Sequence, residues 1–343
     1  MEQQRDELVE RLFEAVLGFN DLHMVYLGDR LGLYAALSEL GAVTPAELAE
    51  ATGTSERYVR EWLEQQAVTG ILEEDGGRFS LPPGHAEVLL DPDSLAYLAP
   101  FARMMVGIVR PVPRLVEAFR TGEGIPYSEY DADFLEGQAE MNRVQFVNLL
   151  GSEWLPAMPD VHERLQADPP ARIADVACGG GWSTIAMARA YPKATVEGYD
   201  LDEASIELAR ANAAAEGLDI RFEVRNAAEI EGEFDLVTVF EAIHDMSQPV
   251  EVLAALRGLG GTLLVVDERV ADSFTAPGDD VERLMFGWSV LHCLPVGLAE
   301  QPSAATGTAM RVDTFRRYAQ EAGFDSVEVL PIENDFWRFY RLR

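Results

Sequence analysis

A glycine turn within alternating strand and helix patterns constrains the fold of this chain most strongly. Residues 175–183, DVACGGGWS, place three consecutive glycines directly after the apolar run RIADVA. From about residue 170 onward, apolar runs such as ATVEGYD and GTLLVVDE alternate with helical stretches such as DEASIELARANAAAEG. Strands that alternate with helices predict a largely parallel, doubly wound α/β sheet, which binds ligands at the carboxyl ends of its strands.

The residues around this turn distinguish between the ligands that a glycine turn can hold. The dinucleotide fingerprint G-x-G-x-x-G fails, because its third glycine position after Gly179 and Gly181 is Thr184. A carboxylate at Asp175 would oppose a pyrophosphate, and we expect it to favour a cationic ligand instead. The pattern acidic-x-(G/A)-x-G-x-G, which begins at Asp175 and has Ala177 in its first glycine position, therefore favours S-adenosylmethionine.

Two further strand ends support this cofactor. Asp200 ends the second predicted strand, where its carboxylate can accept hydrogen bonds from the ribose hydroxyls, and Asn226 ends the third, where its side-chain carbonyl could accept a bond from the adenine amino group. Glu241 follows the fourth strand at the same edge. The predicted cofactor-binding residues are Asp175, Ala177, Gly179, Gly181, Asp200, Leu201, Asn226, Ala227 and Glu241.

On these motifs, the C-terminal half resembles the class I S-adenosylmethionine-dependent methyltransferases. The whole chain resembles bacterial methyltransferases with an N-terminal winged-helix dimerisation domain, which are similar in plan to plant small-molecule O-methyltransferases. The resemblance implies a seven-stranded Rossmann-like sheet whose last strand is antiparallel, with SVEVLPI and FWRFYRL as strands six and seven. It also implies a homodimer and a small-molecule methyl acceptor. Two positions depart from the family pattern, Ala177 at the first glycine and Asn226 at the third-strand acid.

The N-terminal region has the element order of a winged helix. TPAELAEATG (44–53) carries a capping box from Thr44 to Glu47, and SERYVREWLEQQAVTG (55–70) places Val59, Trp62, Leu63 and Ala67 on one helix face. GILEEDGGRFSLP then predicts a hairpin that turns at Asp75-Gly76-Gly77. Residues 1–90 hold 6 arginines against 17 acidic residues, so this domain lacks the basic surface that DNA binding needs. We expect a dimerisation domain.

We predict three regions: the winged-helix domain (1–88), a helical linker or lid (89–166) and the cofactor-binding domain (167–343). The middle region is either a connecting layer or a lid over the acceptor site. In the last domain, MFGWSVLHCLPVG (285–297) either lines that site or packs in the core. The candidate acceptor-binding residues are Met105, Tyr127, Phe146, Trp154, Trp288 and His292.

The stretch FEAIHDMSQP (240–249) carries the candidate catalytic residues. His244 and Asp245 follow the fourth strand, and Asp267 ends the fifth beside Glu268. Plant-type O-methyltransferases carry a His-Asp pair at the corresponding place, with the histidine as general base. An imidazole with an ordinary pKa near 6.5 suits deprotonation near neutral pH, and Asp245 or Asp267 could orient it. The alternative is a structural histidine.

Composition limits the other function classes. The net charge of −32 disfavours nucleic acid and anionic membranes, no run is apolar enough to span a membrane, and the two cysteines predict neither disulfides nor a metal site. We expect a cytoplasmic enzyme that methylates a small, aromatic or apolar metabolite. Two alternatives stay open: a ligand-responsive transcription regulator that uses this fold as a sensor, and an enzyme of the same fold with non-methyl chemistry.

Overall fold

The computed structural model describes residues 1–343, which form two compact units. The first unit comprises residues 1–107 and 136–144, and the second comprises residues 108–135 and 145–343. The helical region predicted at 89–166 is thus shared between both units. No helix is long and apolar enough to cross a membrane.

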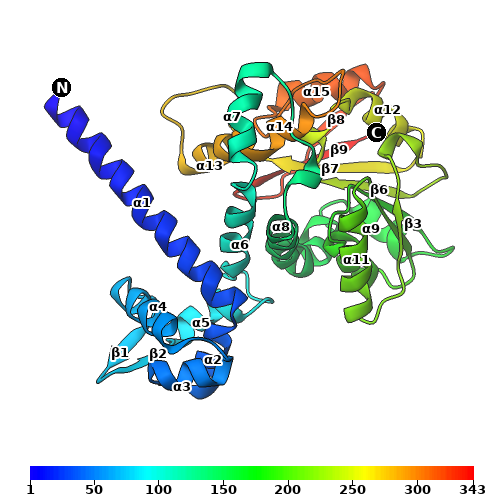
Figure 1. Ribbon diagram of the computed structural model, residues 1–343. Coiled ribbons are helices and arrows are strands. Elements are labelled where there is room, and N and C mark those ends of the chain that lie inside the picture. Colours follow the sequence, from blue (N-terminus) through cyan, green and yellow to red (C-terminus); the bar gives the residue numbers. More distant parts are fainter. The chain divides into compact units, whose positions relative to one another are not determined.

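The first unit is helical with one hairpin (Figure 1). Its core is formed by residues such as Leu37, Leu48, Leu63 and Phe79. Its elements are α1 (Glu2–Arg30), α2 (Leu33–Leu40), α3 (Pro45–Thr52), α4 (Glu56–Val68), β1 (Glu73–Asp75), β2 (Arg78–Ser80), α5 (Pro83–Leu90), most of α6 (Ala99–Ile108) and most of α8 (Ala132–Gln145). The element order of the predicted winged helix is confirmed.

Local sequence signals set the helix and hairpin boundaries here. Thr44 caps α3 in a capping box with Glu47, as predicted. Gly76 and Gly77, with φ of 58° and 82°, turn the hairpin, because a two-residue turn of this type needs positive φ at both positions. On α4 the predicted apolar face is buried at Val59, Trp62 and Leu63, and Ala67 packs against the same core while partly exposed. Gln66 is also buried on this helix.

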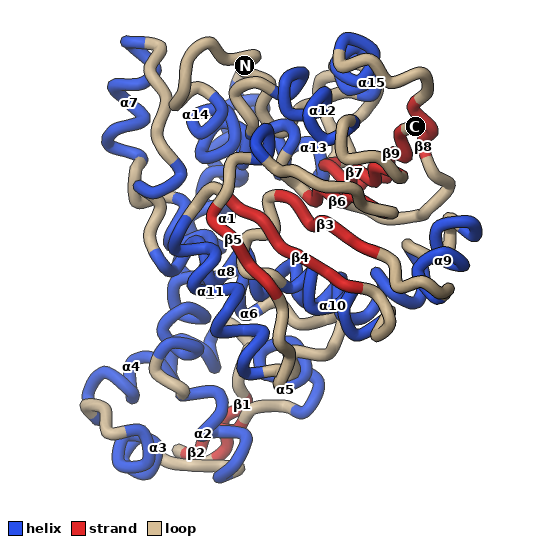
Figure 2. The backbone as a smooth tube through the Cα atoms, turned by 90° about the vertical axis from the view of Figure 1, so that its right-hand side faces the viewer, coloured by secondary structure: helices blue, strands red, loops and turns tan.

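The second unit contains a seven-stranded sheet, seen in Figure 2. The strand order is β5-β4-β3-β6-β7-β9-β8. Strand β9 runs antiparallel to both β7 and β8, while the pairs from β5 through β7 are parallel, so the predicted sheet with its reversed last strand is confirmed. The strands are β3 (Arg172–Val176), β4 (Thr195–Asp200), β5 (Arg221–Val224), β6 (Leu236–Phe240), β7 (Thr262–Glu268), β8 (Val327–Val329) and β9 (Trp337–Leu342).

Helices and short helical turns connect these strands. The regular helices are α7 (Val112–Thr121), α9 (Pro159–Gln166), α10 (Trp182–Ala190), α11 (Glu203–Ala215), α12 (Pro249–Arg257), α13 (Asp280–Trp288), α14 (Leu294–Gly297) and α15 (Val312–Glu321). Short 3₁₀ turns are η1 (Tyr127–Glu129), η3 (Ala227–Glu229) and η4 (Ile243–Asp245). Two segments are π-helical: η2 (Phe146–Trp154), which lies within the region predicted as helical, and η5 (Ser289–Cys293), which joins α13 to α14.

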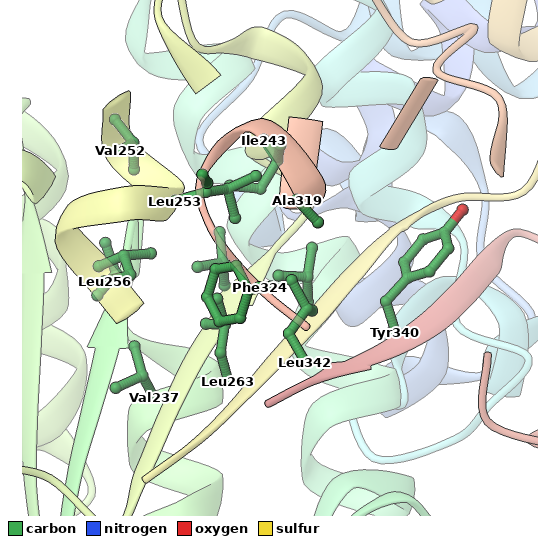
Figure 3. Packing of buried hydrophobic residues seen from close by; sticks show 14 of the residues in the cluster. Val237, Ile243, Val252, Leu253, Leu256, Leu263, Ala319, Phe324, Tyr340 and Leu342 are labelled. Atoms are coloured by element: carbon green, nitrogen blue, oxygen red, sulfur yellow. The ribbon is translucent and has the colours of Figure 1, made fainter. Parts of the chain in front are cut away.

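Apolar side chains from the sheet and from two helices build one core of this unit. Val237 of β6 and Leu263 of β7 pack with Leu253 of α12 and Ala319 of α15 (Figure 3). Full burial of such a side chain stabilises the fold by roughly 1.5–3 kcal/mol. This packing fixes the strands, and their carboxyl ends therefore present the site residues at defined positions.

Candidate active site

The glycine turn joins β3 to α10 with three left-handed residues. Ala177, Gly179 and Gly181 have φ values of 57°, 51° and 78°. A Cβ on Gly181 would lie 2.8 Å from the Cβ of Ala209, so this glycine permits close packing of the turn against α11. A Cβ on Gly179 would meet nothing within 4 Å, so the backbone there borders open space that a ligand can approach.

Asp175, at the end of β3, stabilises this turn through hydrogen bonds of its side chain. Its side chain is fully buried and accepts hydrogen bonds from Ser183 Oγ (2.6 Å), Thr184 Oγ1 (2.6 Å) and Thr238 Oγ1 (2.7 Å). Burial raises the pKa of this carboxyl, although the three hydroxyl donors counteract the increase. The expected direct contact with a cationic ligand does not fit this enclosure. Asp175 instead joins β3, α10 and β6 beneath the turn.

Asp200 connects the end of β4 to the same turn. Its Oδ2 accepts a bond from the Gly179 amide (2.8 Å), and its Oδ1 accepts one from the Asp202 amide (2.9 Å). Each carboxylate oxygen has a second lone pair, so the fixed carboxylate can still accept bonds from a ribose diol. Leu201 beside it is 60% exposed and offers an apolar surface to a base.

Asn226 lies at the predicted edge. Its Oδ1 accepts a bond from the Ala228 amide (2.9 Å) and so caps η3, where Ala227 is the first residue. The second lone pair of Oδ1 could still accept a bond from the adenine amino group, and the side-chain NH₂ group could donate to an adenine ring nitrogen. The predicted contact with adenine therefore stays a prediction.

Glu241 directly follows β6 with a φ of 51°. A non-glycine residue with positive φ is uncommon and is often found at functional sites. The donors and acceptors at the ends of β3, β4, β5 and β6 match a ligand with an amino acid moiety, a ribose and an adenine. We conclude that the residues present fit S-adenosylmethionine.

His244 lies on η4, just past β6, and is surrounded by three carboxylates. Its Nδ1 donates to Asp267 Oδ1 (2.5 Å) and lies 2.9 Å from Glu268 Oε2. Its Nε2 lies 3.0 Å from Asp245 Oδ1, out of line for a hydrogen bond. The structure thus brings together the three predicted catalytic residues, and it adds Glu268, which the sequence indicated only by its place beside Asp267.

The charges around His244 change its protonation. Burial alone would lower its pKa, but Asp245, Asp267 and Glu268 outweigh that effect and raise the pKa well above 6.5. Burial also raises the pKa of Glu268, against the attraction of His244. The pKa of His244 is thus shifted upward from the ordinary imidazole value expected from the sequence, which favours its protonated form.

A second histidine, His292, lies on the other side of Asp245. Its Nδ1 is 3.9 Å from Asp245 Oδ2, and its ring packs against Tyr127, Tyr130 and Phe134 at centroid distances of 5.5, 4.5 and 4.4 Å. Burial lowers its pKa to about 4, so this imidazole is neutral. Two predicted acceptor-binding residues, Tyr127 and His292, are thus in contact.

The other predicted acceptor-binding residues are placed differently. Trp154 and Phe146 belong to the π-helical segment η2 and are buried in an aromatic cluster with Trp337 and Phe339, and their acceptor-binding role stays a prediction. Trp288 ends α13 and is half-buried. Met105 lies on α6 in the first unit.

Family models match both parts of the chain. The model described as "Methyltransferase domain" matches residues 173–259, which include the glycine turn, Asp200, Asn226 and His244. This chain is an S-adenosylmethionine-dependent methyltransferase. Its N-terminal part, residues 22–90, matches the Rv2258c-like winged HTH domain.

Similar proteins agree with this assignment. Over 225 residues the methyltransferase is 26% identical to the ubiquinone biosynthesis O-methyltransferase of Thiobacillus denitrificans, and the match covers 63% of this chain and 88% of that one. For the next six relatives with that name, the matched region spans only 36–54% of their length.

Solved structures resemble the methyltransferase over nearly its full length. The mitomycin 7-O-methyltransferase MmcR has a TM-score of 0.70 at 20% identity, over 100% of this chain and 99% of that one. Human N-acetylserotonin methyltransferase, solved with S-adenosylmethionine, has a TM-score of 0.65 at 18% identity, over 98% of both chains. At these identities the likeness shows the fold alone.

Proposed function

We propose that this methyltransferase methylates a hydroxyl oxygen of a small, aromatic or otherwise apolar metabolite, with His244 as the group that takes the hydroxyl proton. The observation that carries the proposal is the hydrogen bond between His244 Nδ1 and Asp267 Oδ1 (2.5 Å) at the strand ends. The relative from Thiobacillus denitrificans and MmcR are both named as O-methyltransferases, which supports oxygen as the acceptor atom.

The chain's residues divide the work as follows. S-adenosylmethionine, when bound, supplies an electrophilic methyl group on a sulfonium. Asp200, Asn226 and the backbone at Gly179 would hold it, while Asp175 keeps the turn in shape. Asp267 fixes the His244 ring by its bond to Nδ1, which leaves Nε2 to accept the acceptor's proton.

The raised pKa of His244 sets a condition on this role. A protonated imidazole cannot accept a proton, so His244 must lose its proton before the reaction. A bound sulfonium adds positive charge near this edge and would lower the pKa of His244 toward neutrality. General-base assistance of this kind is worth about 10²–10⁴-fold in rate.

We also propose that the chain forms a homodimer through α1. Seven large apolar side chains along this helix are between 41% and 61% exposed and form an apolar stripe that faces water in a single chain. They are Leu8, Val9, Leu12, Phe13, Val16, Leu17 and Phe19. Their spacing puts neighbours one turn apart, which suits a second copy of the same helix.

A role in DNA binding has little support. Arg57 and Arg60, the only basic residues of α4, are paired on the same helix with Glu61 and Glu56. The helix that would enter a DNA groove is thus neutralised by its own acids. Nothing in the comparisons favours the transcription regulator.

The test of the proposed function is a transfer assay with methyl-labelled S-adenosylmethionine and a panel of phenols, carboxylic acids and amines. We expect label on the phenols. Label only on amines would refute methylation of oxygen. Label only on carboxylic acids would refute assistance by a base, since a carboxylate is already deprotonated. Conversion of a compound without transfer of the labelled methyl group and without formation of S-adenosylhomocysteine would favour the non-methyl alternative.

A further inference from the structure

His292 has a buried nitrogen atom without a function in the mechanism above. The side chain is 3% exposed, and its Nε2 has no hydrogen-bond partner in the protein. Most buried polar atoms are hydrogen-bonded, and an unsatisfied one costs about 1–3 kcal/mol. The position is also unusual in its backbone, because His292 belongs to the π-helical segment η5, and such segments are frequent at functional sites.

The neighbours of His292 determine which ring nitrogen carries the proton. Nδ1 lies 3.9 Å from Asp245 Oδ2 and 3.6 Å from Cys293 Sγ. The carboxylate favours a hydrogen on Nδ1, and the neutral ring then carries its lone pair on Nε2. Burial raises the pKa of the Cys293 thiol to about 12, so the sulfur keeps its hydrogen and donates it to the Asp245 carboxylate, which leaves the imidazole hydrogen on Nδ1. Nε2 is therefore a hydrogen-bond acceptor.

The aromatic residues around His292 exclude other partners and provide flat surfaces. Phe134 offers no polar atom, and the Tyr130 hydroxyl is already used in a bond to the carbonyl oxygen of Leu291 (2.7 Å). Tyr127 connects this ring to the cofactor side, since Asp200 and Asp202 act on the electrostatics of its phenol. His292 thus lies near the cofactor edge among aromatic rings.

Asp245 relates the two histidines. Its Oδ1 faces His244 Nε2 at 3.0 Å, and its Oδ2 faces His292 Nδ1 at 3.9 Å. The two rings therefore flank a single carboxylate. A weak base such as His292 does not hold a proton at neutral pH but accepts a hydrogen bond well, whereas His244 is the stronger base. The geometry separates a binding histidine from a proton-accepting one.

We infer that His292 Nε2 accepts a hydrogen bond from a second O–H or N–H group of the methyl acceptor. The acceptor class is then a flat aromatic compound with at least two such donors, one to be methylated beside His244 and one bound by His292. This inference rests on the proposed function for the identity of the first donor. A site built to pair with a donor discriminates against an analogue that lacks it.

The test compares each dihydroxynaphthalene isomer with its monohydroxy parent. Binding is measured by calorimetry in the presence of S-adenosylhomocysteine, so that no methyl transfer is needed. We expect wild type to bind at least one dihydroxy isomer about 3–10-fold more tightly than the parent, as one neutral hydrogen bond provides. His292→Phe keeps a ring among the aromatic neighbours and should lose this advantage, with affinity for the parent unchanged.

Two further variants exclude a folding effect. His292→Gln offers a carbonyl oxygen in place of Nε2 and should restore part of the preference. His162→Phe is the matched control, because His162 bonds Tyr191 and Gln166 away from this site, and it should keep the full preference. Among compounds that are methylated, His292→Phe should raise KM more for the dihydroxy compounds than for their monohydroxy parent.

A preference that persists in His292→Phe, or the lack of any preference in wild type, would overturn the inference. These outcomes are distinct from failure of the proposed function. Preferential binding without methylation of any phenol would refute the proposed function alone, and methylation of phenols without preferential binding would refute the inference alone.

Discussion

Nδ1 of His244 lies 2.5 Å from Oδ1 of Asp267, and both side chains are 1% exposed. Asp267 belongs to β7, and His244 lies on η4, just past β6, which is the parallel neighbour of β7. The pairing of these two strands therefore brings both side chains to the same edge of the sheet. A buried carboxylate at this distance fixes the ring and stabilises its charged form.

Replacement of Asp267 tests this relationship directly. Asp267→Asn removes one of the negative charges that raise the pKa of His244, so that pKa should fall toward the ordinary histidine value. Histidine side-chain NMR over a pH series measures it. Asp313→Asn, an exposed position on α15, is the control and should leave the His244 titration unchanged. An unaltered His244 pKa in Asp267→Asn would mean that Asp245 and Glu268 raise this pKa without a contribution from Asp267.

Asp200 should carry much of the cofactor affinity. Asp200→Ala removes the carboxylate that faces the ribose and also the bond to the Gly179 amide, so we expect binding of S-adenosylmethionine to weaken by about 1.5–3 kcal/mol. Isothermal titration measures it. Asp200→Asn keeps one acceptor oxygen and should lose less. Asp219→Ala, at an exposed position, should bind normally. Equal affinity in folded Asp200→Ala would refute the ribose assignment.

The apolar stripe of α1 predicts the assembly. Phe13→Glu combined with Val16→Glu places two charges on side chains that are 61% and 54% exposed in the single chain, and it should convert a dimer into a monomer. Light scattering after size exclusion measures the mass. Tyr58→Glu, on α4 and 81% exposed, should remain dimeric. A wild-type protein that is already monomeric would contradict the proposed interface.

The sequence predicts what depends on local pattern and on sheet topology. Asp200 ends β4 and Asn226 lies two residues past β5, so their arrival at one edge follows from the alternation of strands and helices. The role of Asp175 does not follow, because its enclosure depends on hydroxyls of Ser183 and Thr238 from two other elements. The raised pKa of His244 cannot be predicted from local sequence either, since the carboxylate of Asp267 is 23 residues away in the chain.

The π-helical segments are a second limit. The spacing of apolar residues near Phe146 and His292 resembles that of an ordinary helix, so the sequence pattern gives no sign of the extra residue per turn. An extra residue per turn rotates the following side chains about the helix axis, so the face that Trp154 and His292 occupy cannot be read from an ordinary helical spacing.

The rate of methyl transfer in His244→Ala tests the central claim most directly. With the best phenol from the acceptor panel, this variant should react about 10²–10⁴-fold more slowly than wild type, while its affinity for S-adenosylmethionine changes little. The wild-type rate should increase with pH as His244 loses its proton. Because the pKa of His244 is raised, this increase should occur above pH 6.5. The alanine variant should lack this increase. A rate within about threefold of wild type, or an unchanged pH profile, would contradict the assignment of His244 as the proton acceptor.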